Sequence, residues 1–503
     1  RRRQGRDRTV HEQGTQRSVS SAADIKSPSS STLAPPTPEG IKAVLPGREP
    51  TGAPVRERGP YTPHIVAWNL TKRCNLACAH CYISAGSWHA TDDELSTDQC
   101  LRILDEILDV NPNPMLILTG GEPLLRDDLE TLAERASAGG ATVVVGTNGT
   151  RLTDERIDSL MEAGVKGVAV SIDSLHPEYH DRFRHGGGAL ADTMAAVGRC
   201  STRRLDFVIQ TTVTTGNRYE IADLARWSAE AGAVSFNVYF VVATGRAEHM
   251  HGMSPEENED VLRELVELEG TYRGRMMVRS KCQPQLMRHV VQGDPDSPLL
   301  NYETRCPCGV HYVRITPEGK VTPCPYMPAV AGDLLTQSFR EIWESSPVFT
   351  QLRSGELGGR CGRCEYREVC GGCRARAYAD SGDFMGPDDS CAYDPSGEMP
   401  LVASRRTVSY GQSRPGGSPV PDAGTASTEQ TAPATIEWTP EALARMDSVP
   451  SFVRGVVIQR VEKFANDRGY TCVDVEVMEE VRRNLPVDFS KKLPFFLGRG
   501  GRA

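Results

Sequence analysis

The chain has 503 residues, with 57 basic and 66 acidic side chains, a net charge of −9 and 39% hydrophobic residues. This length leaves room for about three domains, and the acidic balance argues against a nucleic-acid binder with a basic surface. No apolar run approaches the roughly 18–20 residues needed to cross a bilayer, and no signal-peptide pattern follows the Arg-rich start. We therefore expect a cytoplasmic protein that contacts neither membrane nor nucleic acid.

Residues 1–60 are rich in Arg, Ser, Gly, Pro and Thr and lack apolar periodicity, which predicts disorder. From 61 to 280, short apolar runs alternate with amphipathic helical patterns, for example over 97–110 and 154–163. Six runs are expected to be strands: 64–68, 115–118, 142–145, 167–172, 207–211 and 236–240. Alternating strands and helices imply a parallel α/β sheet, either doubly wound or a partial barrel.

The remaining chain changes character twice. Residues 281–398 are rich in Cys, Gly and Pro with few periodic segments, so a core there would need metal. Residues 399–434 read as a flexible linker because Pro, Gly and Ser are frequent. A small helical domain is predicted over 435–485, with a helix lined by Phe452, Val461 and Phe464 and closed by Gly469, followed by a tail over 486–503.

The 15 cysteines are clumped: three lie within 74–81 and eight within 306–391. Clumped cysteines at short spacing in a cytosolic chain indicate metal binding rather than disulfides. Cys100 and Cys200 fall in helical patterns and are predicted to be buried apolar residues. Cys282 and Cys472 have no partner at ligand spacing.

Cys74, Cys78 and Cys81 directly follow the first predicted strand, where one loop can turn all three toward a common point. Iron–sulfur cubanes take four cysteines, so three would leave one iron open to a further ligand. The alternative is a zinc knuckle whose fourth ligand is His80 or His89.

Polar or Gly-rich segments follow the next three strands. They are Gly120-Gly121-Glu122-Pro123, Thr147-Asn148-Gly149 and Ser171-Ile172-Asp173. The carboxyl ends of strands are where βα barrels place their active sites, and two glycines allow a backbone to approach a ligand closely.

The Cx3Cx2C spacing, with His80 just before the last cysteine, resembles the radical S-adenosylmethionine (SAM) superfamily. The resemblance implies a partial (β/α)6 TIM-like barrel with a 4Fe-4S cluster on Cys74, Cys78 and Cys81. SAM would bind the open iron and be cleaved to a 5′-deoxyadenosyl radical, with electrons from a donor such as ferredoxin or flavodoxin. The implied SAM contacts are Gly120, Gly121, Glu122, Pro123, Asn148, Ser171 and Asp173; no catalytic residue beyond the cluster is identified.

The second group of cysteines, with Gly319-x4-Cys324 before a CxxC-x5-C array, resembles the SPASM extension of radical SAM enzymes, which carries one or two auxiliary 4Fe-4S clusters. The resemblance implies one cluster on Cys361, Cys364, Cys370 and Cys391, and another on Cys324 and Cys373 with Cys306, Cys308 or both. The sequence departs from the usual SPASM pattern in two places. Two residues instead of three separate Cys370 from Cys373, and Cys306 and Cys308 are closer together than the usual first pair. Either departure could leave one auxiliary cluster with an open iron, or absent. Structural zinc ribbons are the alternative.

The substrate is suggested by the run 314–328 with the Gly332-Asp333-Leu334 and Cys370-Gly-Gly-Cys373 segments, which look most like radical SAM enzymes of heme d1 and siroheme-dependent heme synthesis. The C-terminal piece resembles the C-terminal domain of the light-independent protochlorophyllide reductase B subunit. The first resemblance implies a siroheme-derived tetrapyrrole whose side chains are modified, and the second implies a tetrapyrrole context. The alternative for the C-terminal piece is a small helical docking module without a ligand. A peptide or protein maturase and a non-catalytic metal-binding scaffold remain alternatives. Arg182 and Arg184 could clamp substrate carboxylates or form a solvated loop.

Overall fold

The computed structural model describes residues 61–295, 297–301, 304–403, 436–447 and 451–483. The segment predicted to be disordered, most of the predicted linker and the tail after 485 lie outside the described residues. Among the residues described, no helix combines the length and the apolar sequence needed to span a lipid bilayer.

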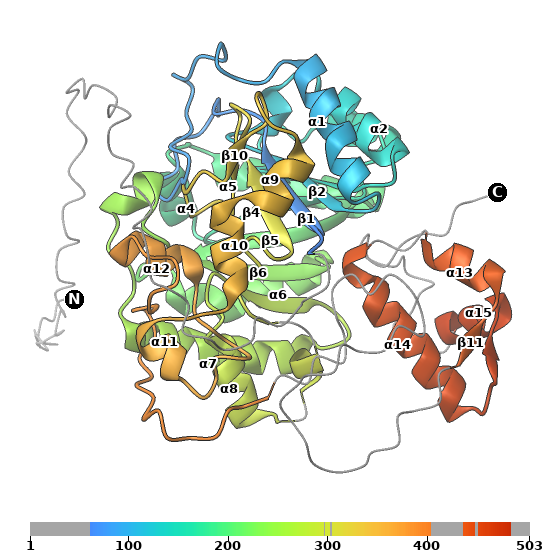
Figure 1. Ribbon diagram of the computed structural model, residues 1–503. Helices are drawn as coiled ribbons and strands as arrows, with labels where there is room; N and C mark the ends of the chain where they lie inside the picture. Colours follow the sequence, from blue (N-terminus) through green and yellow to red (C-terminus); the bar gives the residue numbers. More distant parts are fainter. Residues whose placement is uncertain (1–60, 296, 302–303, 404–435, 448–450, 484–503) are drawn as a thin grey trace, which may run out of the picture. The chain divides into compact units, whose positions relative to one another are not determined.

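A ten-stranded sheet forms the centre of the main body, in the order β10-β9-β8-β1-β2-β3-β4-β5-β6-β7 (Figure 1). Strands β8 and β1 to β7 pair in parallel, and β9 and β10 are antiparallel additions. The strands are β1 (Ile65–Asn69), β2 (Met115–Thr119), β3 (Thr142–Thr147), β4 (Gly167–Ser171), β5 (Asp206–Val213), β6 (Ser235–Phe240), β7 (Met277–Lys281), β8 (Tyr312–Ile315), β9 (Lys320–Thr322) and β10 (Gly332–Asp333).

Helices follow the parallel strands and cover one face of the sheet. They are α1 (Thr97–Val110), α2 (Leu129–Ala138), α3 (Asp154–Glu162), α4 (Pro177–Arg184), α5 (Ala189–Arg203), α6 (Ile221–Ala231) and α7 (Pro255–Tyr272), with single turns η2 (Pro123–Leu125), η3 (Arg218–Glu220) and η4 (Gly245–His249). The predicted α/β architecture is confirmed. The sheet ends at β7 and β10 in the described chain and does not close into a barrel.

The structure adds two parallel strands, β7 and β8, to the six that were predicted. Strand β7 has one buried residue among five and contains Arg, Ser and Lys, and β8 has only four residues, so neither shows the long apolar run of a fully buried parallel strand. Because β8 pairs with β1, the Cys-rich region contributes a strand to the same sheet as β1 to β7.

The core lies between the sheet and its helices. Alternate residues such as Trp68, Leu118 and Val145 are buried in this core, whereas Ala67 and Ala169, of opposite parity, lie outside it and face the inner side of the curved sheet. Helix α1 starts at a capping box in which Ser96 and Gln99 satisfy each other's backbone N–H groups. Thus the helices bury the outer face and leave the inner face for the site.

The Cys-rich region has little regular structure. Its elements are α8 (Leu286–Gly293), η5 (Pro298–Asn301), α9 (Phe339–Ser345), α10 (Pro347–Ser354), α11 (Gly359–Arg363) and α12 (Arg374–Ser381). Helix α9 packs on α1, and Phe339 N–H donates to the Glu106 carboxylate across that contact at 2.8 Å (Figure 1).

The C-terminal body has a small core of its own, formed by residues that include Ile436, Ala442, Val461, Ala465 and Val473. Its elements are β11 (Glu437–Trp438), α13 (Pro440–Asp447), α14 (Ser451–Asp467), β12 (Cys472–Val473) and α15 (Val475–Arg483). Gly469 has a φ of +75° just after α14, the left-handed conformation expected of a helix-ending glycine. The side chain of Phe452 lies outside the described residues.

Candidate cofactor and iron–sulfur sites

The loop after β1 carries the first three predicted metal ligands. Cys74, Cys78 and Cys81 gather in one small cluster with Leu76 and Ala85. The Leu76 N–H donates to Cys74 Sγ at 3.4 Å, and the Ala85 N–H donates to Cys81 Sγ at 3.3 Å. Such donors favour the thiolate, which is the form that binds metal.

Burial works against ionisation of the same thiols. It raises the pKa of Cys74 to about 12 and also raises the pKa of Cys78. A bound metal group would supply the positive charge that holds these cysteines deprotonated. Three thiols on one loop, two of them with N–H donors, fit the three-cysteine ligation of a 4Fe-4S cluster.

Turn η4, after β6, holds this loop in place. Arg246 donates from Nε to Cys78 O and from Nη1 to Ala85 O, both at 2.8 Å. Gly245 adopts a φ of +61°, and a Cβ there would lie 2.6 Å from the carbonyl oxygens of Cys81 and Tyr82. Arg246 gave no sequence signal, because its role depends on a loop far away in the chain.

Gly120 and Gly121 pack against the backbone that leads into Cys74. The Gly121 N–H donates to Thr71 O at 2.7 Å, and a Cβ on Gly121 would lie 2.2 Å from Arg73 O. The close backbone approach predicted for these glycines is therefore made to the cysteine loop. Pro123 is buried and opens η2. Contact of this segment with SAM stays a prediction.

The Glu122 carboxylate links the carboxyl ends of β2 and β3. It is fully buried and accepts hydrogen bonds from Thr147 Oγ1 and the Asn148 N–H, both at 2.8 Å, and from the Leu124 N–H at 3.1 Å. Burial raises the pKa of Glu122, although these donors act in the opposite direction. Its observed partners are protein groups, so a role in SAM binding is not tested.

Asn148 connects β3 to the cysteine loop. Its Nδ2 lies 3.8 Å from Cys74 Sγ and donates to Asn75 Oδ1 at 2.9 Å. Ser171 ends β4 and is half-buried. The structure thus brings the predicted strand-end residues of β2 and β3 onto the loop that carries Cys74.

Asp173 is fully buried and pairs with Arg184, whose Nε and Nη2 both donate to Asp173 Oδ2, at 2.8 Å and 2.7 Å. Burial favours a raised pKa, but Arg184 and the neighbouring histidines hold the pKa of Asp173 below its usual range. Arg184 Nη1 also lies 3.9 Å from Cys78 Sγ. The solvated-loop interpretation of Arg184 is therefore wrong, since this residue is 5% exposed and ends α4, whereas Arg182 is exposed.

The two histidines of the zinc alternative have other neighbours. His80 stacks on Phe183 with ring centroids 4.5 Å apart, and burial lowers its pKa to about 4. His89 Nε2 lies 3.0 Å from Ser84 O. Within the described chain, no three His, Cys, Asp or Glu side chains converge closely enough to hold one bare metal ion.

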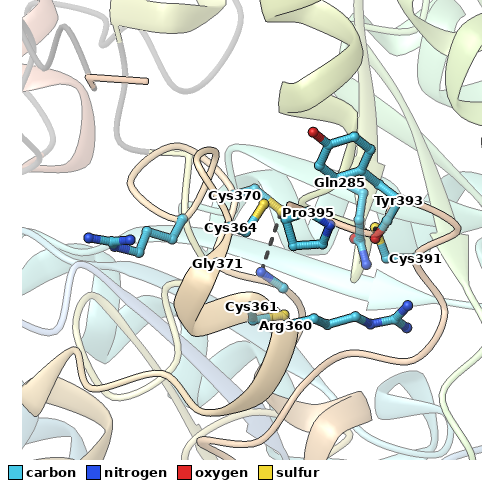
Figure 2. Close-up of a pocket in the computed structure, with 11 residues that line it drawn as sticks. Gln285, Arg360, Cys361, Cys364, Cys370, Gly371, Cys391, Tyr393 and Pro395 are labelled. Carbon is cyan, nitrogen blue, oxygen red and sulfur yellow. Dashed lines mark hydrogen bonds between the residues drawn. The ribbon is translucent and has the colours of Figure 1, made fainter. Parts of the chain in front are cut away.

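Four of the later cysteines line one hollow of about 340 Å³. Figure 2 shows how they lie around it. They are Cys361, Cys364, Cys370 and Cys391, the set that the resemblance assigns to one auxiliary cluster. The Gly372 N–H donates to Cys370 Sγ and the Asp388 N–H donates to Cys361 Sγ, both at 3.4 Å. Thiols spaced around a hollow, with N–H donors on their sulfurs, fit a multi-iron cluster.

The other auxiliary cysteines form a second group. Cys306 Sγ lies 3.4 Å from Cys308 Sγ, and Cys308 also interacts with Cys324. Cys373 interacts through its thiol with Cys282, for which no partner was predicted. Sequence spacing could not indicate this partner of Cys282, because Cys373 comes from a distant part of the chain. Cys100 and Cys200 are buried in the core, as predicted.

A second hollow, of about 230 Å³, lies at the carboxyl ends of β5 and β6. It is lined by His80, Thr212, Tyr239, Phe240, Val241, Val242, Ala247 and Tyr326. Thr212, Tyr239 and Lys281 are register partners on β5, β6 and β7, so their side chains point to the same face of the sheet. Burial lowers the pKa of Lys281 to about 8 and raises that of the Tyr326 phenol.

Comparison with protein families gives three matches. Residues 68–228 match the radical SAM superfamily, residues 306–374 match the SPASM iron–sulfur cluster-binding domain, and residues 438–482 match the proto-chlorophyllide reductase 57 kD subunit. The three matches lie in the segment from β1 to α6, in the Cys-rich region and in the C-terminal body.

Individual relatives extend this picture. The chain is 38% identical to the AdoMet-dependent heme synthase of Methanosarcina barkeri, over 66% of this chain and 97% of that one. It is 31% identical to the pre-heme d1 synthase of Dinoroseobacter shibae, over 66% and 87%. The structure of Streptococcus suis SuiB bound to S-adenosylmethionine shares the fold, with a TM-score of 0.55 at 14% identity over 66% of this chain and 78% of that one.

The family matches and the cysteine geometry agree on the chemistry of the chain. It is a SAM-dependent iron–sulfur enzyme with a SAM-binding 4Fe-4S cluster and an auxiliary-cluster domain. The chain belongs to the radical SAM superfamily, among the SPASM-containing members that include the AdoMet-dependent heme synthases and the pre-heme d1 synthase.

Proposed function

We propose that this enzyme modifies the carboxylate side chains of a siroheme-derived tetrapyrrole in heme-type biosynthesis. The observation that carries the proposal is the 38% identity to an AdoMet-dependent heme synthase across 97% of that protein. The match leaves no large part of the relative without a counterpart here.

The chemistry of the inner hollow supports a flat, carboxylate-bearing substrate. Its lining is aromatic and aliphatic, with Tyr239, Phe240 and Tyr326 offering ring surfaces. Lys281 lies beside Tyr239 in the strand register, and its charged neighbours among the described residues are Arg279 and the Cys282 thiol, with no carboxylate. A half-buried ammonium without an acidic partner would favour a propionate or acetate group of the substrate.

When bound, the cluster and SAM supply one-electron cleavage of SAM, which provides the radical needed for hydrogen abstraction. The protein's own residues position the parts. Cys74, Cys78 and Cys81 hold the iron, Arg246 fixes their loop, and Lys281 orients the substrate by its carboxylate. His80, which lines the hollow, stacks on Phe183, and the Phe183 carbonyl oxygen accepts a hydrogen bond from the Ala79 N–H of the cysteine loop.

The test is anaerobic incubation of the reduced, reconstituted full chain with SAM and one candidate substrate at a time. Siroheme, didecarboxysiroheme and iron coproporphyrin III would be compared with candidate precursor peptides. We expect loss of carbon dioxide from one tetrapyrrole, in step with 5′-deoxyadenosine formation. Coupling of 5′-deoxyadenosine to peptide modification alone would refute the tetrapyrrole proposal and favour the maturase alternative.

A matched pair of variants tests the role of Lys281. In Lys281→Met the KM for the tetrapyrrole should rise about 10- to 100-fold, the range expected for a hydrogen bond to a charged group. Lys166→Met removes an exposed lysine from a loop before β4 and should change nothing. SAM cleavage without substrate should be equal in both variants.

A further inference from the structure

Cys282 lies directly after β7 in a conformation that cysteine rarely adopts. Its φ is +60°, in the left-handed region that favours glycine, where a Cβ lies too close to the following carbonyl oxygen and strains the backbone. Something in the fold must hold it there. Strained residues of this kind cluster at functional sites, which makes the surroundings of Cys282 worth following.

Arg376, a buried residue of α12, holds this turn. Its Nη1 donates to Cys282 O and to Gln283 Oε1, both at 2.8 Å, and its Nη2 donates to Val241 O at 3.1 Å. The guanidinium thereby ties the end of β7 to the segment that follows β6. It also places a positive charge beside the Cys282 thiol.

The same network positions Cys373. The Cys373 N–H donates to Asp388 Oδ2 at 2.7 Å, and that carboxylate also lies 3.6 Å from Arg376. The Cys282 and Cys373 thiols consequently interact directly, and the Cys324 thiol lies close enough to Cys282 to act on it electrostatically. The buried pair of Arg376 and Asp388 thus brings Cys282, which follows β7, close to Cys373 and Cys324.

Five thiols are therefore available where a cubane needs four. Cys306 Sγ and Cys308 Sγ are 3.4 Å apart. Because Cys306 and Cys308 are in contact and a single residue separates them in the sequence, we take them as alternatives for one corner of the cluster, which leaves the other three corners to Cys282, Cys324 and Cys373.

We propose that Cys282 is a ligand of the auxiliary 4Fe-4S cluster, together with Cys308, Cys324 and Cys373. Each thiol loses its proton to solvent as its iron–sulfur bond forms, and no iron changes oxidation state in that step. Cys306 then lies beside the cluster as a fifth thiol that is not needed for ligation. Its Sγ accepts backbone N–H groups of Cys308 and Arg374.

This ligation would decide what the cluster does. Four thiolates leave no iron open to substrate, so the cluster would transfer electrons and would not bind the tetrapyrrole or peptide. The inference concerns the resting cluster and does not depend on which substrate is correct.

The experiment measures iron, sulfide and the electron paramagnetic resonance spectrum of the reconstituted full chain without substrate. The background carries Cys74→Ala, Cys78→Ala and Cys81→Ala, so that only auxiliary clusters contribute. Cys282→Gly is the decisive variant, because glycine suits a φ of +60° and should fold at least as well. Cys324→Ser is the positive control, Cys306→Ser tests the rival ligand, and Cys472→Ser is a remote control in the C-terminal body.

We expect Cys282→Gly and Cys324→Ser to lose the same spectral component and about four irons per chain. The variants Cys306→Ser and Cys472→Ser should keep both the spectral component and the iron. Full iron and an unchanged spectrum in Cys282→Gly, with loss in Cys306→Ser, would overturn the proposal. Loss of iron in all four variants would also overturn it, because the effect would then not be specific to ligands.

Discussion

The two cysteine-rich regions are supported in different ways. The loop with Cys74 is attached to the ends of β2, β3 and β6 through the Glu122 backbone N–H and the Asn148 and Arg246 side chains. The four cysteines around the hollow in Figure 2 lie on short elements and loops between α10 and residue 403. A strand end can place thiols before metal arrives, whereas loops of this length depend on the metal for their shape.

The largest expected effect is on chemistry. Replacing Cys74, Cys78 and Cys81 together with alanine should reduce 5′-deoxyadenosine production to the level of a no-enzyme control. The fold of the loop should survive, because protein hydrogen bonds hold it. Anaerobic product analysis and circular dichroism would measure the two effects, and a collapse of secondary structure would contradict the comparison.

The corresponding change in the other region should affect its fold. Cys361→Ala, Cys364→Ala and Cys370→Ala together remove three thiols around the hollow, and the segment from 355 to 403 should become open to proteases. Limited proteolysis with mass spectrometry would locate the new cuts. Equal cutting in the triple variant of the first loop would show that the two regions do not differ.

Arg184→Met should lower the free energy of unfolding by about 3–5 kcal/mol, because it leaves the buried Asp173 carboxylate without its counter-charge. Arg182→Met, an exposed change on the same helix, should cost about 0.5 kcal/mol or less. Urea unfolding followed by circular dichroism would compare them. If both variants were equally stable, the ion pair would not support the loop.

Gly121→Ala should destabilise the loop by about 1–3 kcal/mol, because its Cβ would meet the Arg73 carbonyl oxygen at 2.2 Å. Gly187→Ala is the matched control, since nothing lies within 4 Å of a Cβ at that position. Thermal unfolding and SAM cleavage would both be recorded. A neutral Gly121→Ala would mean that the loop adapts easily.

The smallest effect is expected from removing residues 404–503. The C-terminal body has its own core, so SAM cleavage without substrate should stay within about twofold of the full chain. Anaerobic kinetics would measure it. A large loss would show that the C-terminal body supports one of the two cysteine regions.

The six apolar strands were predictable because strands buried in a parallel sheet have near-continuous runs of apolar residues. Strand β7 was not predicted, because its sequence contains Arg, Ser and Lys and only one of its residues is buried. The four cysteines that the resemblance groups together line one hollow, and short spacing keeps three of them within one short stretch of the chain.

Residues whose roles arise from tertiary contacts could not be found in this way. Arg184 looked like part of a charged loop, but docking of α4 buries it on Asp173. Cys282 meets its partners only because Arg376, 94 residues later, binds its carbonyl oxygen. Spacing along a chain carries no information about such contacts, and only a signal such as covariation across relatives could have indicated them.

The pairing of β8 with β1 has a practical consequence for dissecting the enzyme. A fragment that ended at residue 280 would uncover the full edge of β1, a buried and apolar strand with unpaired backbone groups. Such an edge invites pairing with other chains and aggregation. The barrel strands should therefore be expressed together with residues up to at least 333, where β10 completes that side of the sheet.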